Sequence, residues 1–285
     1  MKRLVYLAAV AAVTLAASCG NESAPAGPVL NVDSLAVNDS LVYGRSSAEI
    51  SISGLYPDSG VTPLIDSTRR WLADCLSQGT FSEQKRIIIP TQAEIARPQQ
   101  LLEHLTKKIL ASAKRDFIEF EYEDDLSAGY EYQINFEPTY QTESLLTYAY
   151  NTYYYLGGAH GSSTTRVATF AVPSGVMLTY ANVFLPDRHK ELIARIRNGL
   201  WAQYFSPTMG DSSATLADAL LIDPTELDLP ACAPEFGPNG VTFTYGQYEI
   251  APYAAGMPAC TLSYSDLHPL MQEWIIPLIT NSQPN

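Results

Sequence analysis

Polar and apolar residues alternate along several segments, and this period of two restricts the fold of the chain more than any other feature. Residues 130–136 read Tyr-Glu-Tyr-Gln-Ile-Asn-Phe, and residues 48–53 follow the same period. The alternation places one set of side chains on each face of a β-strand. A sheet-rich fold is therefore expected. Further strands are predicted at residues 117–125, 144–156, 164–172, 176–179, 241–245, 248–252 and 260–264.

Helical patterns occupy separate blocks between these strands. Apolar residues recur every three or four positions from Thr62 to about Gly79, from Pro98 to about Arg115, from about Asp187 to Phe205, and again after Ser265. Helices and strands thus come in blocks and do not alternate strictly. The predicted fold class is therefore α+β, with mainly antiparallel sheets packed with a few helices in a two-part module.

Residues 117–125 and 130–136 together predict a β-hairpin, because the Ser-Ala-Gly sequence at 127–129 is typical of a turn. Aromatic and aliphatic side chains fall on one face of this hairpin, and acidic side chains fall on the other. We therefore expect one side to join the core and the other to form an exposed acidic surface. The glutamates assigned to that surface are Glu119, Glu121, Glu123 and Glu131.

The N-terminus has the pattern of a bacterial export signal. Lys2 and Arg3 precede an apolar run over residues 4–17, and Cys19 follows a small-residue cleavage site. The run is too short to cross a hydrocarbon core of roughly 30 Å. We predict lipidation of Cys19 and attachment to the cell envelope, on the periplasmic or surface face of the outer membrane. The alternative is plain secretion with an incidental cysteine.

Four segments follow from these patterns. Residues 1–18 form the signal peptide, and residues 19–46 form a lipidated tether whose composition predicts flexibility. Residues 47–152 form an N-terminal α+β subdomain, and residues 153–281 form a C-terminal α+β domain.

Acidic residues outnumber basic ones by 30 to 17, which gives a net charge of −13 at pH 7. Loss of the signal peptide removes two of the basic residues. Such a surface repels nucleic acid and speeds the approach of cationic partners. Nucleic acid is thus not an expected partner, although solubility alone also accounts for much of the charge.

Three cysteines follow Cys19. Cys75 occupies an apolar helix position and is predicted to be a buried thiol. Cys232 and Cys260 lie in a strand-rich stretch, and an oxidising compartment would permit a disulfide between them. The spacing of the cysteines does not resemble that of a zinc site.

Patterns that indicate an enzyme are weak. The four histidines share no metal-binding spacing, and the chain has neither a His-Glu-x-x-His motif nor a Gly-x-Ser-x-Gly elbow. We therefore expect no catalytic residue, no metal and no cofactor.

Two blocks of sequence resemble the domain-of-unknown-function family 3298. The first includes Tyr-Tyr-Tyr-Leu-Gly-Gly-Ala-His-Gly at 153–161 with the segments 169–175 and 178–184, and the second includes Tyr-Glu-Ile-Ala-Pro-Tyr-Ala-Ala-Gly at 248–256. Leu-Tyr-Pro at 55–57 resembles the companion N-terminal region. This pairing is similar to the extracellular part of lysozyme-sensing anti-sigma-V factors and to the non-catalytic region of peptidoglycan deacetylases. The resemblance implies a two-part binding module at the cell envelope.

His160, Glu249 and Tyr253 are the candidate binding residues within these blocks. His160 is a candidate ligand or acid–base group, but the favoured interpretation is that it hydrogen-bonds the backbone and holds its turn. Glu249 could be held by a tyrosine hydroxyl or by His160, or it could point outward. The many tyrosines could build the core or stack on sugars and partner proteins.

Three functional hypotheses remain from the sequence. The first is a non-enzymatic lipoprotein that captures a cationic protein such as lysozyme through the acidic face. The second is a peptidoglycan-binding or glycan-binding module that uses the tyrosine-rich strands. The third is an envelope hydrolase that uses His160 and Glu249.

Overall fold

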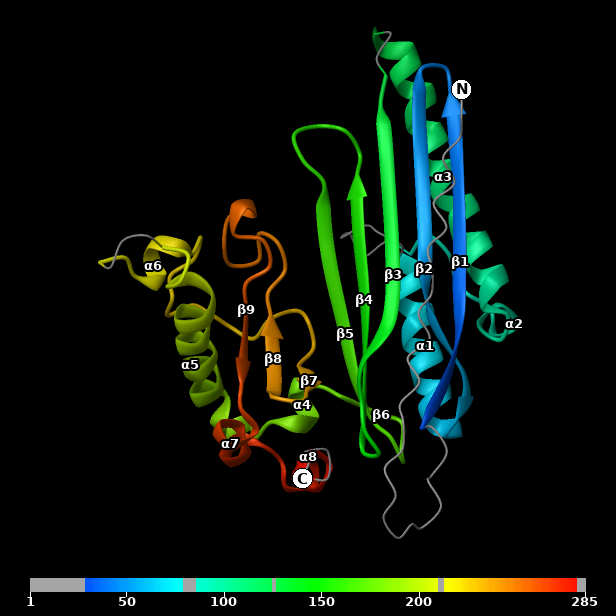
Figure 1. Ribbon diagram of the computed structural model, residues 1–285. Coiled ribbons are helices and arrows are strands. Elements are labelled where there is room, and N and C mark those ends of the chain that lie inside the picture. Colours follow the sequence, from blue (N-terminus) through cyan, green and yellow to red (C-terminus); the bar gives the residue numbers. More distant parts are fainter. Residues whose placement is uncertain (1–28, 79–85, 125–126, 210–212, 281–285) are drawn as a thin grey trace, which may run out of the picture.

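The computed structural model describes residues 29–78, 86–124, 127–209 and 213–280. The predicted export signal and Cys19 therefore lie outside the described residues. Two sheets with associated helices make up the described part, which confirms the α+β class (Figure 1).

The larger sheet has six strands in chain order. Its members are β1 (Leu30–Tyr43), β2 (Ser46–Gly60), β3 (Gly129–Gln141), β4 (Leu145–Tyr155), β5 (Ser162–Ala171) and β6 (Val176–Leu178). Neighbouring strands are antiparallel except β2 and β3, which are parallel. A parallel pair needs a crossover, and the helices between β2 and β3 supply it.

Helices α1 (Thr62–Gln78), α2 (Gln92–Ile95) and α3 (Pro98–Asp124) form this crossover, and α1 and α3 cover one face of the sheet (Figure 1). The alternating residues of β2 and β3 point toward them, as the period of two predicts. Tyr132, Ile134 and Phe136 are at most 1% exposed, whereas Glu131 and Gln133 between them are exposed. One hydrophobic cluster therefore fills the space between sheet and helices.

A second region follows β6. Its sheet contains β7 (Glu235–Gly237), β8 (Gly240–Thr244) and β9 (Ala259–Leu262). Around this sheet lie α4 (Tyr180–Val183), η1 (Pro186–Arg188), α5 (His189–Leu200), the π-helical turn η2 (Trp201–Phe205), α6 (Leu216–Ala219), η3 (Tyr253–Ala255), α7 (Tyr264–Leu267), η4 (His268–Leu270), η5 (Glu273–Ile275) and α8 (Ile276–Thr280). These elements enclose a second hydrophobic cluster.

Buried hydrogen bonds join the two regions. The Thr147 hydroxyl donates to the Phe236 carbonyl at 2.7 Å, and the Phe236 N–H donates to the Thr169 hydroxyl at 3.2 Å. Thr147 and Thr169 are neighbours on β4 and β5, on the sheet face opposite α1 and α3. The second region therefore covers one end of this outer face.

The predicted hairpin is wrong in its first strand. Residues 117–124 continue α3, and β3 pairs with β2 in parallel. The buried side chains of Ile109, Ala113 and Phe117 lie four residues apart, so the helical stripe extends beyond Arg115. Over so short a stretch, the pattern of residues 117–125 fits a strand as well as a helix. Packing of the helix on the sheet decides in favour of the helix.

Residues 30–43 also differ from the prediction, because this part of the expected tether is strand β1. Leu30, Leu35 and Val37 pack in the first hydrophobic cluster, and every residue of β1 has a partner residue on β2. Pairing with β2 compensates for a sequence that is polar on its own. Residues 248–252 form turns and not the predicted strand.

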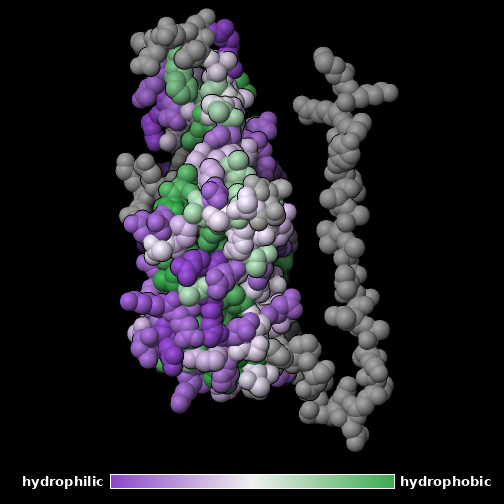
Figure 2. Space-filling model, turned by 90° about the vertical axis from the view of Figure 1, so that its left-hand side faces the viewer, coloured by the Kyte–Doolittle hydropathy of each residue, from purple (hydrophilic) through white to green (hydrophobic). Residues whose placement is uncertain are grey.

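The two hydrophobic clusters overlap along the chain, because Leu145 already belongs to the second. The first cluster extends to Val172, whereas the expected division at residue 152 falls inside β4. Figure 2 shows the side of the molecule on which α5 and α6 lie, where hydrophilic residues predominate and hydrophobic residues appear in separate small areas. Among the described helices, none is both long and apolar enough to cross a membrane.

Candidate ligand-binding site

The loop at 157–161 joins β4 to β5, and glycines determine its shape. Gly157 and Gly158 have φ values of 82° and 91°, which other residues rarely adopt. The Tyr155 hydroxyl donates to the Gly158 carbonyl at 2.9 Å. A Cβ on Gly161 would lie 2.4 Å from the Tyr153 ring, so a larger residue there would have to displace that ring. These features therefore fix the shape of the loop and the position of His160 in it.

His160 packs against the second sequence block. Its ring stacks on Tyr253 with centroids 3.7 Å apart and planes 19° apart. Its Nδ1 lies 2.9 Å from the Gly161 carbonyl, and the Tyr253 hydroxyl donates to the same carbonyl at 2.9 Å. A carbonyl only accepts, so Nδ1 carries the proton. His160 therefore hydrogen-bonds the backbone of its own turn, which is one of the two roles that the sequence leaves open for it.

Tyr248 is the most unusual residue of this loop pair. Its φ is 63°, and no other described non-glycine residue has a positive φ. Its side chain is 56% exposed, its hydroxyl lies 3.5 Å from His160 Nε2, and its ring centroid lies 5.8 Å from that of Tyr253. Sequence reasoning did not single out Tyr248, because backbone strain at a tyrosine leaves no mark on composition or periodicity.

Gln247 ties the two loops together. Its Oε1 accepts hydrogen bonds from the Ser163 N–H at 2.8 Å and from the Ser162 hydroxyl at 3.3 Å. Both serines begin β5, so the loop after β8 is attached to the edge of the larger sheet. The three rings of His160, Tyr248 and Tyr253, which we call the aromatic cluster, are thus held between the two regions.

Glu249 has a different position from the one that the hydrolase hypothesis requires. Its two carboxylate oxygens accept from the Ala231 N–H at 2.8 Å and the Gly246 N–H at 2.6 Å. In the described structure His160 instead contacts Tyr248 and Tyr253. Glu249 therefore holds its own loop, and the two residues are not joined as a pair.

The open part of the outer sheet face continues from the aromatic cluster. Strand pairing places Asn38, Ser51, Gln133, Tyr153 and Ser163 side by side across the five strands β1 to β5. A shallow groove of about 360 Å³ lies over β1, β2 and β3 on this face. Its lining includes Asn38, Ser51 and Gln133 from this row. Amide, hydroxyl and tyrosine side chains therefore form a continuous polar surface.

The four predicted surface glutamates do not share one face. Glu119 and Glu121 belong to α3, on the helix-covered side of the sheet, and Glu131 lies on the outer face of β3. The side chain of Glu123 lies outside the described residues. The predicted acidic surface fails because it depended on the hairpin. A smaller acidic pair replaces it, since Glu49 and Glu131 are neighbours across β2 and β3.

The disulfide that the sequence leaves possible between Cys232 and Cys260 is not formed, because Cys75, Cys232 and Cys260 are all free thiols. Cys260 points toward α5, where its Sγ lies 3.5 Å from the Ile196 carbonyl, so it does not face Cys232. Burial raises the pKa of Cys232 to about 11 and that of Cys260 to about 12. Both therefore remain protonated and poorly nucleophilic at neutral pH. Cys75 is buried, as predicted.

Within the described ranges, no group of three His, Cys, Asp or Glu side chains is arranged to hold a metal ion. The aromatic cluster has one histidine, two phenol hydroxyls and backbone carbonyls as its polar groups. These groups suit hydrogen bonding and ring stacking with a ligand.

Comparison with known families identifies two segments of the chain. Residues 82–163 match the family described as Deacetylase PdaC, and residues 235–265 match the family described as Protein of unknown function (DUF3298). The resemblance to family 3298 is confirmed. The DUF3298 match contains Tyr248 and Tyr253, whereas the loop with His160 falls in the PdaC match and not in the DUF3298 match. The aromatic cluster thus joins the two matched segments.

Solved structures of DUF3298 proteins share the fold. A family member from Bacteroides fragilis is 21% identical, with a TM-score of 0.68 over 87% of this chain and 96% of that one. A DUF3298 protein from Pseudomonas aeruginosa PAO1 is 15% identical, with a TM-score of 0.59 over 90% of this chain and 97% of that one. A search of curated proteins finds no significant match.

Proposed function

We propose that this protein is an exported, non-catalytic module of the cell envelope, anchored through a lipid on Cys19, that binds an envelope glycan such as peptidoglycan. The DUF3298 and PdaC matches suggest an envelope-associated accessory domain. The signal-like N-terminus supports export and lipidation.

The single observation that carries glycan binding is the conformation of Tyr248. A bulky residue with positive φ is strained by about 1 kcal/mol or more, and such strain persists mainly where surrounding structure and function require it. Here the result of the strain is an exposed phenol ring beside His160 and Tyr253. An exposed aromatic ring with a polar edge offers a surface on which the apolar face of a sugar ring packs.

Glycan binding also requires hydrogen bonds along an extended sugar chain, and the outer sheet face offers the groups for them. The row from Asn38 to Ser163 presents amides and hydroxyls, which donate and accept equally well. Sugar hydroxyls and acetamido groups have the same dual character. An extended glycan is therefore expected to lie along this face and end at the aromatic cluster.

The test is co-sedimentation of the purified protein with peptidoglycan sacculi, at low and at high salt. We expect retention at both, because packing and neutral hydrogen bonds are weakly screened. Tyr248→Ala should weaken retention by about threefold to tenfold, the effect of roughly 0.5–1.5 kcal/mol per aromatic contact. Tyr264→Phe removes a hydroxyl that donates to the Gly237 carbonyl, away from the aromatic cluster, and serves as the matched control.

Unchanged retention of the Tyr248→Ala variant would contradict glycan binding at the aromatic cluster. A loss of retention that is equal for Tyr264→Phe would instead indicate a general effect on the fold. Hydrolysis of the sacculi by the wild-type protein, detected as released muropeptides, would contradict the non-catalytic assignment.

The acidic pair favours a second candidate, which is capture of a cationic protein such as lysozyme. Glu49 and Glu131 lie side by side on the outer face and line the shallow groove. Opposite charge would steer encounter, and the interaction would fall steeply with added salt. Calorimetry with lysozyme at low salt, using the Glu49→Lys/Glu131→Lys variant as the comparison, separates this candidate from glycan binding.

A further inference from the structure

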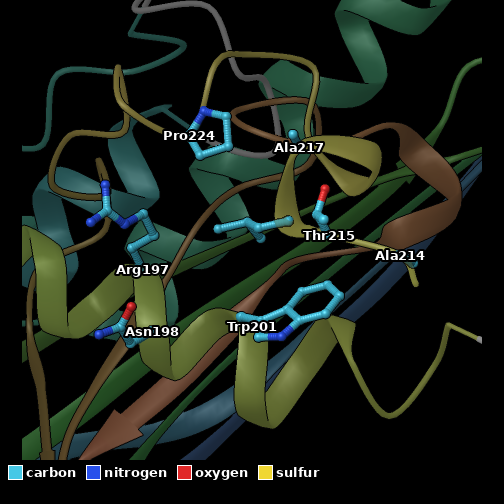
Figure 3. Close-up of a pocket in the computed structure, with 8 residues that line it drawn as sticks. Arg197, Asn198, Trp201, Ala214, Thr215, Ala217 and Pro224 are labelled. Carbon is cyan, nitrogen blue, oxygen red and sulfur yellow. The ribbon is translucent and has the colours of Figure 1, made fainter. Parts of the chain in front are cut away.

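A second cavity lies apart from the aromatic cluster, between the C-terminal half of α5 and the segment around α6 (Figure 3). Its volume is about 410 Å³, within the range of small-molecule sites. The lining combines a cationic, an amide and an indole side chain with small apolar ones. The lining residues are Arg197, Asn198, Trp201, Ala214, Thr215, Leu216, Ala217 and Pro224.

Each polar side chain on the helix side of the cavity can donate a hydrogen bond. Arg197 contributes a guanidinium, Trp201 an indole N–H, and Asn198 an amide. Within the described part of the chain, none of these side chains has a hydrogen bond or an ion pair. By contrast, the neighbouring Arg195 is paired with Glu191 at 2.7 Å. The cavity therefore presents a positive charge and donors that no described residue occupies.

The π-helical turn explains why Trp201 faces the cavity. The Ser206 N–H donates to the Trp201 carbonyl five residues earlier, which widens the helix by one residue. On the other side of this turn, Gln203 exchanges two hydrogen bonds with Thr261 of β9, at 2.9 Å each. Gln203 thus holds the turn on the sheet, and Trp201 lies opposite Thr215 across the cavity (Figure 3).

The opposite wall is apolar, and its polar group is already satisfied. The Thr215 hydroxyl donates to Asp218 at 2.7 Å as part of a helix cap. Ala214, Leu216 and Pro224 supply hydrocarbon surface. A ligand that fits both walls needs an acceptor with negative charge at one end and an apolar body at the other.

We propose that the Arg197–Trp201 cavity binds a small organic carboxylate with an apolar body. The guanidinium and the amide receive the carboxylate, because arginine matches its two oxygens in one plane. The indole ring and the apolar wall enclose the body of the ligand. This site is independent of the proposed glycan surface, since its lining residues make no part of the aromatic cluster.

The experiment uses ¹⁵N-labelled protein and two probes, N-acetyl-alanyl-alanine and benzoate, each compared with its amide. The indole N–H signal of Trp201, assigned through Trp201→Phe, is followed during titration. We expect at least one carboxylate to shift this signal saturably and its amide to leave it unchanged. Arg197→Gln should weaken that binding by roughly tenfold or more, the effect of one charge-assisted hydrogen bond.

Lys190→Gln is the matched control, because it removes one exposed positive charge from the same helix without touching the cavity. Its affinity should stay within about twofold of wild type. Equal binding of acid and amide, equal weakening by Lys190→Gln, or no shift with either probe at millimolar concentration would each overturn the proposal. Unchanged sacculus retention by Arg197→Gln separates this result from the glycan hypothesis.

Discussion

At the scale of single residues, strain distinguishes Tyr248 from the glycines of the neighbouring loop. Gly157 and Gly158 adopt positive φ at no steric cost, whereas Tyr248 does so against the clash of its Cβ. The surrounding contacts must offset that clash. Tyr248 lowers the stability of the fold and exposes its ring, and both properties suit a role in binding better than a role in folding.

Strain at residue 248 predicts that two substitutions there differ in stability. Tyr248→Gly removes the clash and should raise the free energy of unfolding by about 1 kcal/mol relative to Tyr248→Ala, which keeps the strained φ with a Cβ. Urea denaturation followed by circular dichroism measures both. If the glycine variant is the less stable of the two, then the backbone at 248 is not strained and the main argument for the site is lost.

At the scale of elements, local sequence and long-range packing compete in α3. The alternation of glutamate and aromatic residues after Arg115 fits a strand, but Phe117 continues the buried stripe of the helix and packs against Tyr130, with ring centroids 4.9 Å apart and planes tilted by 58°. The helix before it is already formed and extends at little cost. The crossover then delivers β3 parallel to β2, which a hairpin could not do.

The short helix α2 offers an electrostatic prediction. Hydrogen bonds from the backbone and side chain of Thr91, and from His104, lower the pKa of Glu94 to about 2. The carboxylate therefore stabilises the fold at pH above its unfolded value of 4.5, and this contribution is lost as pH falls toward 2. We expect Glu94→Gln to flatten the fall in stability between those pH values. A pH series of thermal melts tests this, and parallel curves for both proteins would contradict it.

At the scale of the whole molecule, two hydrophobic clusters meet through a polar contact. Thr147 and Thr169 are both fully buried, and each hydroxyl satisfies one backbone group of Phe236. A buried network of this kind contributes orientation more than net stability, because each group left without a partner costs its full desolvation. The threonine pair therefore fixes how the second region sits on the sheet, and with it the aromatic cluster.

We predict that Thr169→Val, which is nearly isosteric, lowers the free energy of unfolding by roughly 1–3 kcal/mol, because the Phe236 N–H loses its acceptor. Thr164→Val on the same strand is the control, since its hydroxyl pairs with Thr152 alone within the sheet. Denaturation should also change from one transition toward two for Thr169→Val. An equal, single-step loss for both variants would show that the contact does not couple the regions.

The sequence by itself determined the class of the fold and the inward and outward faces of β2 and β3. These properties depend on local periodicity, which survives in any arrangement of the elements. For His160 the sequence left two roles open, and the backbone contact is visible only in the structure. The two sequence blocks that resemble family 3298 contain both loops of the aromatic cluster, although the sequence does not show that the loops are in contact.

Only the tertiary structure decided which segments meet. It joined β1 to the sheet, extended α3, separated Glu119 and Glu121 from Glu131, and left Cys232 and Cys260 unpaired. It also created the strained Tyr248 and the cavity beside Trp201. These features arise from contacts between residues far apart in the chain, whose energies no local pattern records, and so they appear only when the whole core is packed.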